Sequence, residues 1–109
     1  ARISASAQVA GKKVTVTYRV IPTSSNYDVS EVYGYWNFAP GVDNGSANQA
    51  GKQTVNEKEG TIVFDLENDK NYKDNLYKIQ GNGNKIYVRI GAKTEGVINY
   101  STIIETIVQ

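Results

Sequence analysis

The stretch Val14-Thr-Val-Thr-Tyr-Arg-Val20 has the clearest pattern in the sequence, because apolar and polar side chains alternate along all of it. The segment before it, Ile3-Ser-Ala-Ser-Ala-Gln-Val9, alternates in the same way. A period of two is typical of a β-strand with one buried face. Residues 10–12 contain a glycine and supply a short turn, so residues 3–20 predict a β-hairpin.

Further strands are expected along the rest of the chain. Alternation predicts them at residues 31–38, 61–66, 86–92 and 97–108, with a weaker edge strand near 53–55. In the last of these, the pairs Ile103-Ile104 and Ile107-Val108 break the alternation, which predicts a β-bulge or burial on both faces. Residues 67–84 are expected to form a long polar connection with one structured turn.

The composition favours the same fold class. Val and Ile together number 22, whereas Leu occurs twice, and there are eight Tyr. β-Branched and aromatic side chains suit a pleated, half-buried surface. The 109 residues fit one domain, residues 1–109. We therefore predict an all-β fold, an antiparallel two-sheet sandwich of immunoglobulin-like type with about seven strands, and a small barrel is the alternative.

Several function classes are disfavoured by what the chain lacks. It has no Cys and no His, so it offers no thiolate nucleophile, no imidazole base and none of the usual zinc or haem ligands. A net charge of +1 argues against a dedicated nucleic-acid binder. No apolar run approaches the roughly 18 residues needed to span a bilayer. We expect neither an enzyme nor a cofactor or metal site.

Two segments resemble known families. The run Lys85-Ile-Tyr-Val-Arg-Ile-Gly-Ala-Lys-Thr94, with the later Tyr100-Ser101-Thr102, resembles the closing hairpin of fibronectin type III domains. Trp36-Asn37-Phe38 resembles the Trp-Asp-Phe motif of PKD domains, another immunoglobulin-like family. Together they cover about a quarter of the chain. The resemblance implies a sandwich module of the kind repeated in bacterial surface proteins and multi-domain glycoside hydrolases, and no specific activity.

A candidate ligand surface follows from the strand pattern. If Trp36 lies in the core, Tyr33 and Tyr35 point to the opposite face, and Tyr87 and Arg89 lie on the outward face of the penultimate strand. The two strands are neighbours in immunoglobulin-like topology, so the four side chains are expected to form one exposed patch. Such a patch suits stacking on sugar rings or packing on another domain. Alternatively, it consists of cross-strand pairs that only stabilise the sheet, and a register shift of one residue would expose Trp36 instead.

The segment 65–74 contains a second candidate site. Its carboxylates are hard oxygen ligands of the kind that Ca²⁺ takes: Asp65, Glu67, Asp69 and Asp74. The segment departs from the EF-hand loop, because Lys70 stands where that loop needs Gly and no Glu occupies its twelfth position. A solvated acidic loop is the simpler interpretation.

The function expected from these patterns is non-catalytic. We expect an extracellular or cell-surface β-sandwich module that serves as a spacer, adhesion or assembly domain of a larger protein. Its partners would be neighbouring domains of that protein, a glycan or a surface protein, and not nucleic acid. One alternative is a carbohydrate-binding module that uses the aromatic patch. Another is a phage or pilus surface domain that contributes an edge strand to a neighbour.

Overall fold

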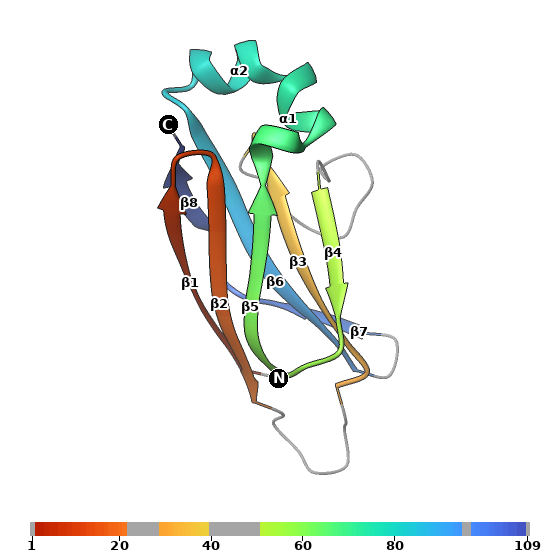
Figure 1. The fold of residues 1–109 in the computed structure, drawn as a ribbon. Coiled ribbons are helices and arrows are strands. Elements are labelled where there is room, and N and C mark those ends of the chain that lie inside the picture. The colour runs from red at the N-terminus through yellow and green to blue at the C-terminus, as the bar shows by residue number, and fades with distance from the viewer. Residues whose placement is uncertain (1, 22–28, 40–50, 95–96, 109) are drawn as a thin grey trace.

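The computed structural model describes residues 2–21, 29–39, 51–94 and 97–108. Its strands form two antiparallel sheets that face each other as a sandwich (Figure 1). The first sheet has the order β1 (Arg2–Ala10), β2 (Lys13–Ile21) and β5 (Glu59–Asp65). The second has the order β4 (Gly51–Val55), β3 (Glu31–Asn37), β6 (Lys85–Thr94) and β7 (Val97–Tyr100), and β8 (Ile104–Ile107) also pairs with β6. The predicted all-β sandwich is confirmed.

The core lies between the two sheets and is built by the alternation seen in the sequence. Every second side chain of β2, β5, β3 and β6 is almost fully buried there: Val14, Val16, Tyr18, Val20, Ile62, Phe64, Val32, Trp36, Ile86, Val88, Ile90 and Ala92. Burying a side chain of this size stabilises the fold by roughly 1.5–3 kcal/mol before entropy is counted. Trp36 faces this core, as the sequence predicts.

Gly34 allows the two sheets to approach closely. It is the inward residue of β3 between Val32 and Trp36, and it has no side chain to place between the sheets. A Cβ at this position would lie 2.8 Å from Ile62 Cδ1 and 3.3 Å from Phe64 Cζ. The side chains of β5 therefore occupy the space above this glycine.

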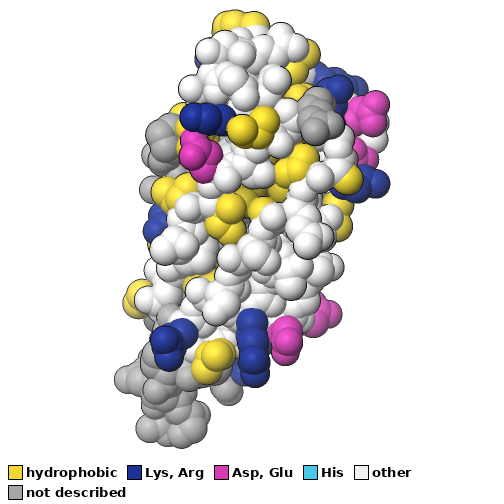
Figure 2. All heavy atoms as spheres, turned by 90° about the vertical axis from the view of Figure 1, so that its left-hand side faces the viewer, with side chains coloured by type: hydrophobic (Ala, Val, Ile, Leu, Met, Phe, Trp, Pro, Cys, Tyr) yellow, Lys and Arg dark blue, Asp and Glu magenta, His cyan; other side chains and the backbone are white. Residues whose placement is uncertain are grey.

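The two long sides of the sandwich are closed in different ways. On one side β1 lies beside β8, and half-buried apolar residues of β1 pack on the core: Ile3, Ala5, Ala7 and Val9. Figure 2 shows hydrophobic side chains across the middle of this side and charged side chains mostly towards its two ends. On the other side, Gln53 Nε2 of β4 donates to the Val63 carbonyl oxygen of β5 at 2.6 Å. That hydrogen bond links the edges of the two sheets.

The segment predicted as one last strand, residues 97–108, is divided into β7 and β8, and the step between them is a bulge, one of the two predicted alternatives. Tyr100 pairs with Gly91, whereas Ile104 pairs with Val88, so three residues of the last strand stand opposite two residues of β6. Ser101 holds this site, because its Oγ accepts from the Ile90 N–H at 3.0 Å and its N–H donates to the Ile90 carbonyl at 2.8 Å. The extra residue changes the face of everything beyond it.

The connection between β5 and β6 is helical, which the sequence did not predict. It contains a 3₁₀ turn at Leu66–Asn68, α1 (Lys70–Asp74) and α2 (Leu76–Gly81). These short elements cover one end of the sandwich (Figure 1), and they bury Leu66, Tyr72 and Ile79. Asp69 begins α1, since its Oδ1 accepts from the Tyr72 N–H at 3.2 Å. Helices of five and six residues have too few turns to show a periodic pattern.

Candidate functional site

The four residues predicted as a ligand surface do lie on one face. β3 and β6 are hydrogen-bonded neighbours, and Tyr35 pairs with Arg89 while Asn37 pairs with Tyr87. The side chains of Tyr33, Tyr35 and Tyr87 belong to one cluster on the outer face of the second sheet, together with Ile98 and Tyr100 of β7. The structure therefore brings the predicted residues together.

The predicted exposure of this patch is wrong. Tyr33 is 4% exposed and Tyr35 is fully buried. Tyr35 lies over Gly91, where a Cβ would come within 3.0 Å of its ring, and its ring centroid is 6.1 Å from that of Tyr100. The pairing of β7 with β6 brings Ile98 and Tyr100 onto this face, and they bury the rings that β3 places there. The result is a second small core and not an open platform.

Both the hydroxyl and the ring of Tyr33 have partners inside the protein. The Tyr33 hydroxyl donates to the carboxylate of Glu31, and the Lys52 Nζ lies 4.3 Å from the centre of the Tyr33 ring. The hydrogen bond to Glu31, and after it burial and the nearby negative charge, raise the pKa of Tyr33 to about 12. The hydroxyl is thus held protonated and engaged.

Tyr87 and Arg89, the two predicted site residues of β6, are half-buried and also have partners within the protein. Arg89 Nε donates to the Ser101 carbonyl at 2.6 Å, and its guanidinium lies 4.6 Å from the centre of the Tyr100 ring. The Tyr87 hydroxyl accepts from Asn82 Nδ2 at 3.4 Å. These contacts hold the outer cluster together from its rim. A ligand-binding role for Tyr87 and Arg89 stays a prediction.

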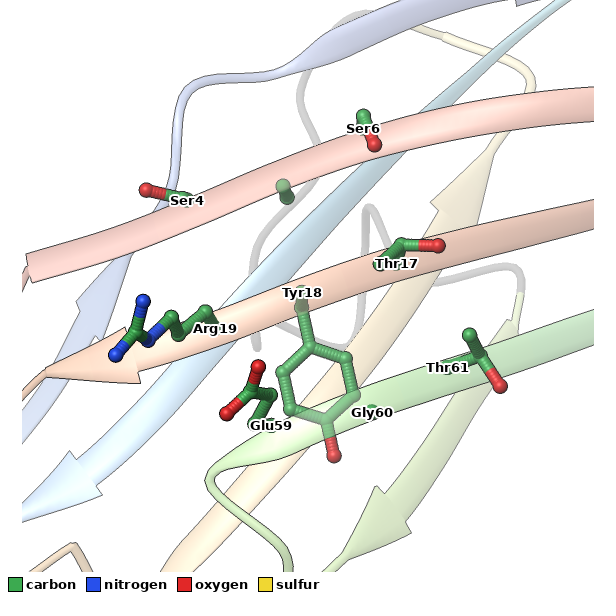
Figure 3. Close-up of a pocket in the computed structure, with 9 residues that line it drawn as sticks. Ser4, Ser6, Thr17, Tyr18, Arg19, Glu59, Gly60 and Thr61 are labelled. Carbon is green, nitrogen blue, oxygen red and sulfur yellow. The ribbon is translucent and has the colours of Figure 1, made fainter.

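A different surface is hollowed on the first sheet (Figure 3). A cavity of about 410 Å³ crosses β1, β2 and β5, and we call it the sheet hollow; its lining is Ser4, Ala5, Ser6, Thr17, Tyr18, Arg19, Glu59, Gly60 and Thr61. The strand register arranges the polar members in two rows. One row contains three hydroxyl groups, those of Ser6, Thr17 and Thr61, and the other contains Ser4, Arg19 and Glu59.

The floor between these rows is backbone, because the side chains of Ala5 and Tyr18 point towards the core and Gly60 has none. Ala5, Tyr18 and Gly60 pair with one another across the three strands. Gly60 has a φ of +157°, a conformation that favours glycine. The Tyr18 ring lies between β2 and β5 beside Gly60 (Figure 3), and its hydroxyl donates to the Glu57 carbonyl at 2.8 Å. Burial, with a smaller contribution from the Glu57 charge, raises the pKa of Tyr18.

The sequence predicts that some residues of the sheet hollow face outwards, but it does not predict that they come together in one site. Ser4, Ser6, Thr17 and Arg19 carry the polar half of two alternating strands. Glu59 and Gly60 precede the predicted strand at 61–66, and the residues that pair between β2 and β5 lie 40 to 52 positions apart in the sequence. A local pattern contains no signal for such a register.

The acidic segment does not gather its carboxylates. Asp65 accepts from Asn68 Nδ2 at 2.7 Å, Asp69 is occupied by α1, and Asp74 lies 3.7 Å from Lys70 Nζ. A cavity of about 550 Å³ beside Asp65 and Glu67 is lined as well by two lysines, Lys12 and Lys13. Among the described residues, no three acidic, His or Cys side chains lie close enough to hold a metal ion. In the same part of the chain, no helix has the length and apolar character needed to cross a membrane.

Three crystal structures share this fold. A DUF3823 family protein from Parabacteroides merdae ATCC 43184 has 17% identity and a TM-score of 0.68 over 95% of this chain and 50% of its own. A second, from Bacteroides ovatus ATCC 8483, has 15% identity and a TM-score of 0.71 over 98% of this chain and 55% of its own. The third, described as a putative carbohydrate binding protein, is from Bacteroides uniformis ATCC 8492, with 19% identity and a TM-score of 0.69 over 98% of this chain and 56% of its own.

These likenesses show the fold, and this chain spans about half the length of the three proteins. None of the curated proteins compared with the chain matches it. A family profile described as a domain of unknown function, DUF3823_C, matches residues 2–105. This match extends over nearly all of the sandwich, and the chain therefore belongs to the DUF3823_C family.

Proposed function

We propose that this chain is a non-catalytic, immunoglobulin-like module of a larger extracellular or cell-surface protein, in which it serves as a spacer, adhesion or assembly unit. The observation that carries the proposal is the share of each chain covered. The sandwich accounts for nearly all of this chain but only 50–56% of three proteins that contain the same fold. Neighbouring domains of the same protein are then its first partners.

The chemistry of the chain supports a non-catalytic role. No His or Cys occurs anywhere in the 109 residues, so hydrolysis would depend on carboxylates or on a Ser-Lys pair. Asp65, Asp69 and Asp74 each have a different partner, and the contact of Asp69 begins α1. A glycosidase needs two carboxylates facing one bond from opposite sides, and these acidic side chains are not arranged in that way.

Turnover is the test of this proposal. The purified chain is incubated with soluble xylan, starch, mannan and pectin, and new reducing ends are measured over time. We expect none. The non-catalytic proposal would be overturned by a sugar-releasing activity that co-purifies with the chain. That activity must also disappear when one carboxylate of the chain is changed to the amide. Sedimentation over a wide range of concentration tests the pilus-type alternative, which requires association through an edge strand; we expect a monomer.

Carbohydrate binding is the second candidate function. The specific observation in its favour is that one of the three similar structures is described as a putative carbohydrate binding protein. The aromatic patch of the second sheet is a poor site for it, because Tyr33 and Tyr35 are buried. A glycan would therefore need another surface of this module.

A further inference from the structure

We infer that the sheet hollow binds a short neutral oligosaccharide. The inference rests on the carbohydrate-binding candidate above and names its site and ligand class. The hollow is formed by one sheet alone, so the site is complete within this chain. Its lining comes from three strands that are fixed by continuous backbone pairing.

The polar rows of the hollow match the chemistry of sugar hydroxyls. A sugar hydroxyl both donates and accepts, so it needs partners of both kinds. Ser6, Thr17 and Thr61 each supply a group that does both, in one row across the sheet. In the next row, Arg19 supplies donors and Glu59 supplies acceptors. All these side chains are exposed, and within the described part of the chain none of them forms a hydrogen bond or ion pair.

The charge of the hollow selects a neutral ligand. Arg19 and Glu59 stand opposite each other on β2 and β5, so the charges of the site cancel. A charged ligand at this pair meets one like and one opposite charge, so an acidic saccharide or a cationic ligand gains little net attraction. A neutral ligand gains charge-assisted hydrogen bonds to both groups without placing a like charge beside either.

The size and floor of the hollow set the length of the ligand. Neighbouring strands lie about 4.8 Å apart and alternate residues about 7 Å apart, so the six polar groups cover an area of roughly 10 by 7 Å. The cavity of about 410 Å³ lies near the small end of ligand sites. Both values fit one or two sugar rings. Between the rows, Ala5 and Gly60 leave a flat floor for the apolar C–H face of a ring.

Among the described residues, the exposed aromatic ring of Tyr77 is a weaker site. Tyr77 on α2 is 69% exposed, and Lys78 Nζ lies 5.7 Å from the centre of its ring. One projecting ring without convergent hydrogen-bonding groups does not fix the orientation of a sugar. It serves instead as the comparison site in the experiment.

The test is a backbone amide NMR titration of the whole chain with cellotriose, xylotriose, maltotriose and mannotriose, and with trigalacturonic acid as the acidic comparison. We expect saturable shifts from at least one neutral trisaccharide, confined to residues 4–6, 17–19 and 59–61. We expect weaker or no shifts from the acidic one.

Matched variants connect the shifts to the side chains. Thr17→Val removes one hydroxyl of the hollow and keeps the shape of the side chain, and Thr15→Val makes the same change on the same face of β2 outside the hollow. Arg19→Gln and Glu59→Gln remove the two charges. We expect about tenfold weaker binding for Arg19→Gln and Glu59→Gln, a smaller loss for Thr17→Val, and no change for Thr15→Val.

Each other outcome overturns the inference in a distinguishable way. Shifts centred on Tyr77 would move the glycan site to α2 and leave carbohydrate binding standing. Equal loss of binding in Thr15→Val and Thr17→Val would show that the hollow does not contact the sugar. No shift with any saccharide would remove both the hollow and the carbohydrate-binding candidate, while the non-catalytic proposal depends only on the turnover assay.

Discussion

The indole N–H of Trp36 donates to the Oδ2 atom of Asp69 at 3.2 Å. The other oxygen of the same carboxylate accepts from the Tyr72 N–H and begins α1. Trp36 is fully buried, and its ring centroid lies 6.4 Å from that of Tyr72. One side chain of the polar connection thus satisfies the indole of the core and fixes the helix that covers it.

Replacing this carboxylate should be costly. Asp69→Ala removes the cap of α1 and leaves the buried indole N–H without its acceptor, so we expect the free energy of unfolding to fall by roughly 2–4 kcal/mol. Urea denaturation followed by Trp fluorescence measures it. Asp74→Ala is the control, because its ion pair with Lys70 is exposed and the expected loss is below about 0.5 kcal/mol. Equal losses in the two variants would contradict this role of Asp69.

Gly51 is expected to tolerate no side chain. A Cβ there would lie 2.0 Å from Trp36 Nε1, so β4 or the indole must move. We expect Gly51→Ala to lower the free energy of unfolding by roughly 2–3 kcal/mol or more, as overpacking of a core does. Thermal melts of the two variants check this, because Gly81→Ala, where the new Cβ meets nothing within 4 Å, should be neutral or slightly stabilising. A stable Gly51→Ala variant would mean that the indole is held less tightly than the contacts indicate.

The bulge should depend on the Ser101 hydroxyl. Ser101→Ala deprives the Ile90 N–H of its acceptor inside the sheet, for an expected loss of about 1–3 kcal/mol. Amide hydrogen exchange of Ile90 should accelerate in that variant. Thr102→Ala, one residue away and exposed, should change neither the stability nor the exchange rate.

Alkaline pH should weaken the outer cluster through Tyr33. The pKa of Tyr33 is about 12 in the folded protein and near 10 in an unfolded chain, so the folded state holds this proton more tightly. The resulting stabilisation is fully present below pH 10 and is lost as the pH rises towards 12. We expect the free energy of unfolding to fall more steeply over that interval in the wild type than in Tyr33→Phe. Parallel curves would contradict the shift, and Tyr77→Phe, which changes an exposed ring, should match the wild type.

Most of the strands, and the face of each that points to the core, could be predicted from the sequence. Alternation in Val14–Val20 and Ile86–Ala92 is a local property, and the structure buries the predicted side chains of both segments. The pairs Ile103-Ile104 and Ile107-Val108 break the alternation, which is a local property as well, and they predicted either a bulge or burial on both faces. The strand register shows the bulge.

The candidate site was less predictable, for physical reasons. The alternation of side chains along β3 predicts which face Tyr35 occupies. Whether that face is covered depends on Ile98 and Tyr100 of another strand. The sheet hollow depends on the register between Thr17 and Thr61, which is set by tertiary packing. The role of Asp69 was hidden, because its partner Trp36 lies 33 residues earlier in the chain.

The bulge at Ser101 makes the C-terminal strand sensitive to the number of its residues as well as to their kind. Ile98 and Tyr100 before it belong to the outer cluster, whereas Ile104 and Val108 after it belong to the main core. All four have even numbers, so an uninterrupted strand would send them to the same face. The single additional residue exchanges the two faces of the sheet for every side chain that follows it. A one-residue deletion here would exchange inside for outside along the whole C-terminal segment, although every remaining side chain is unchanged.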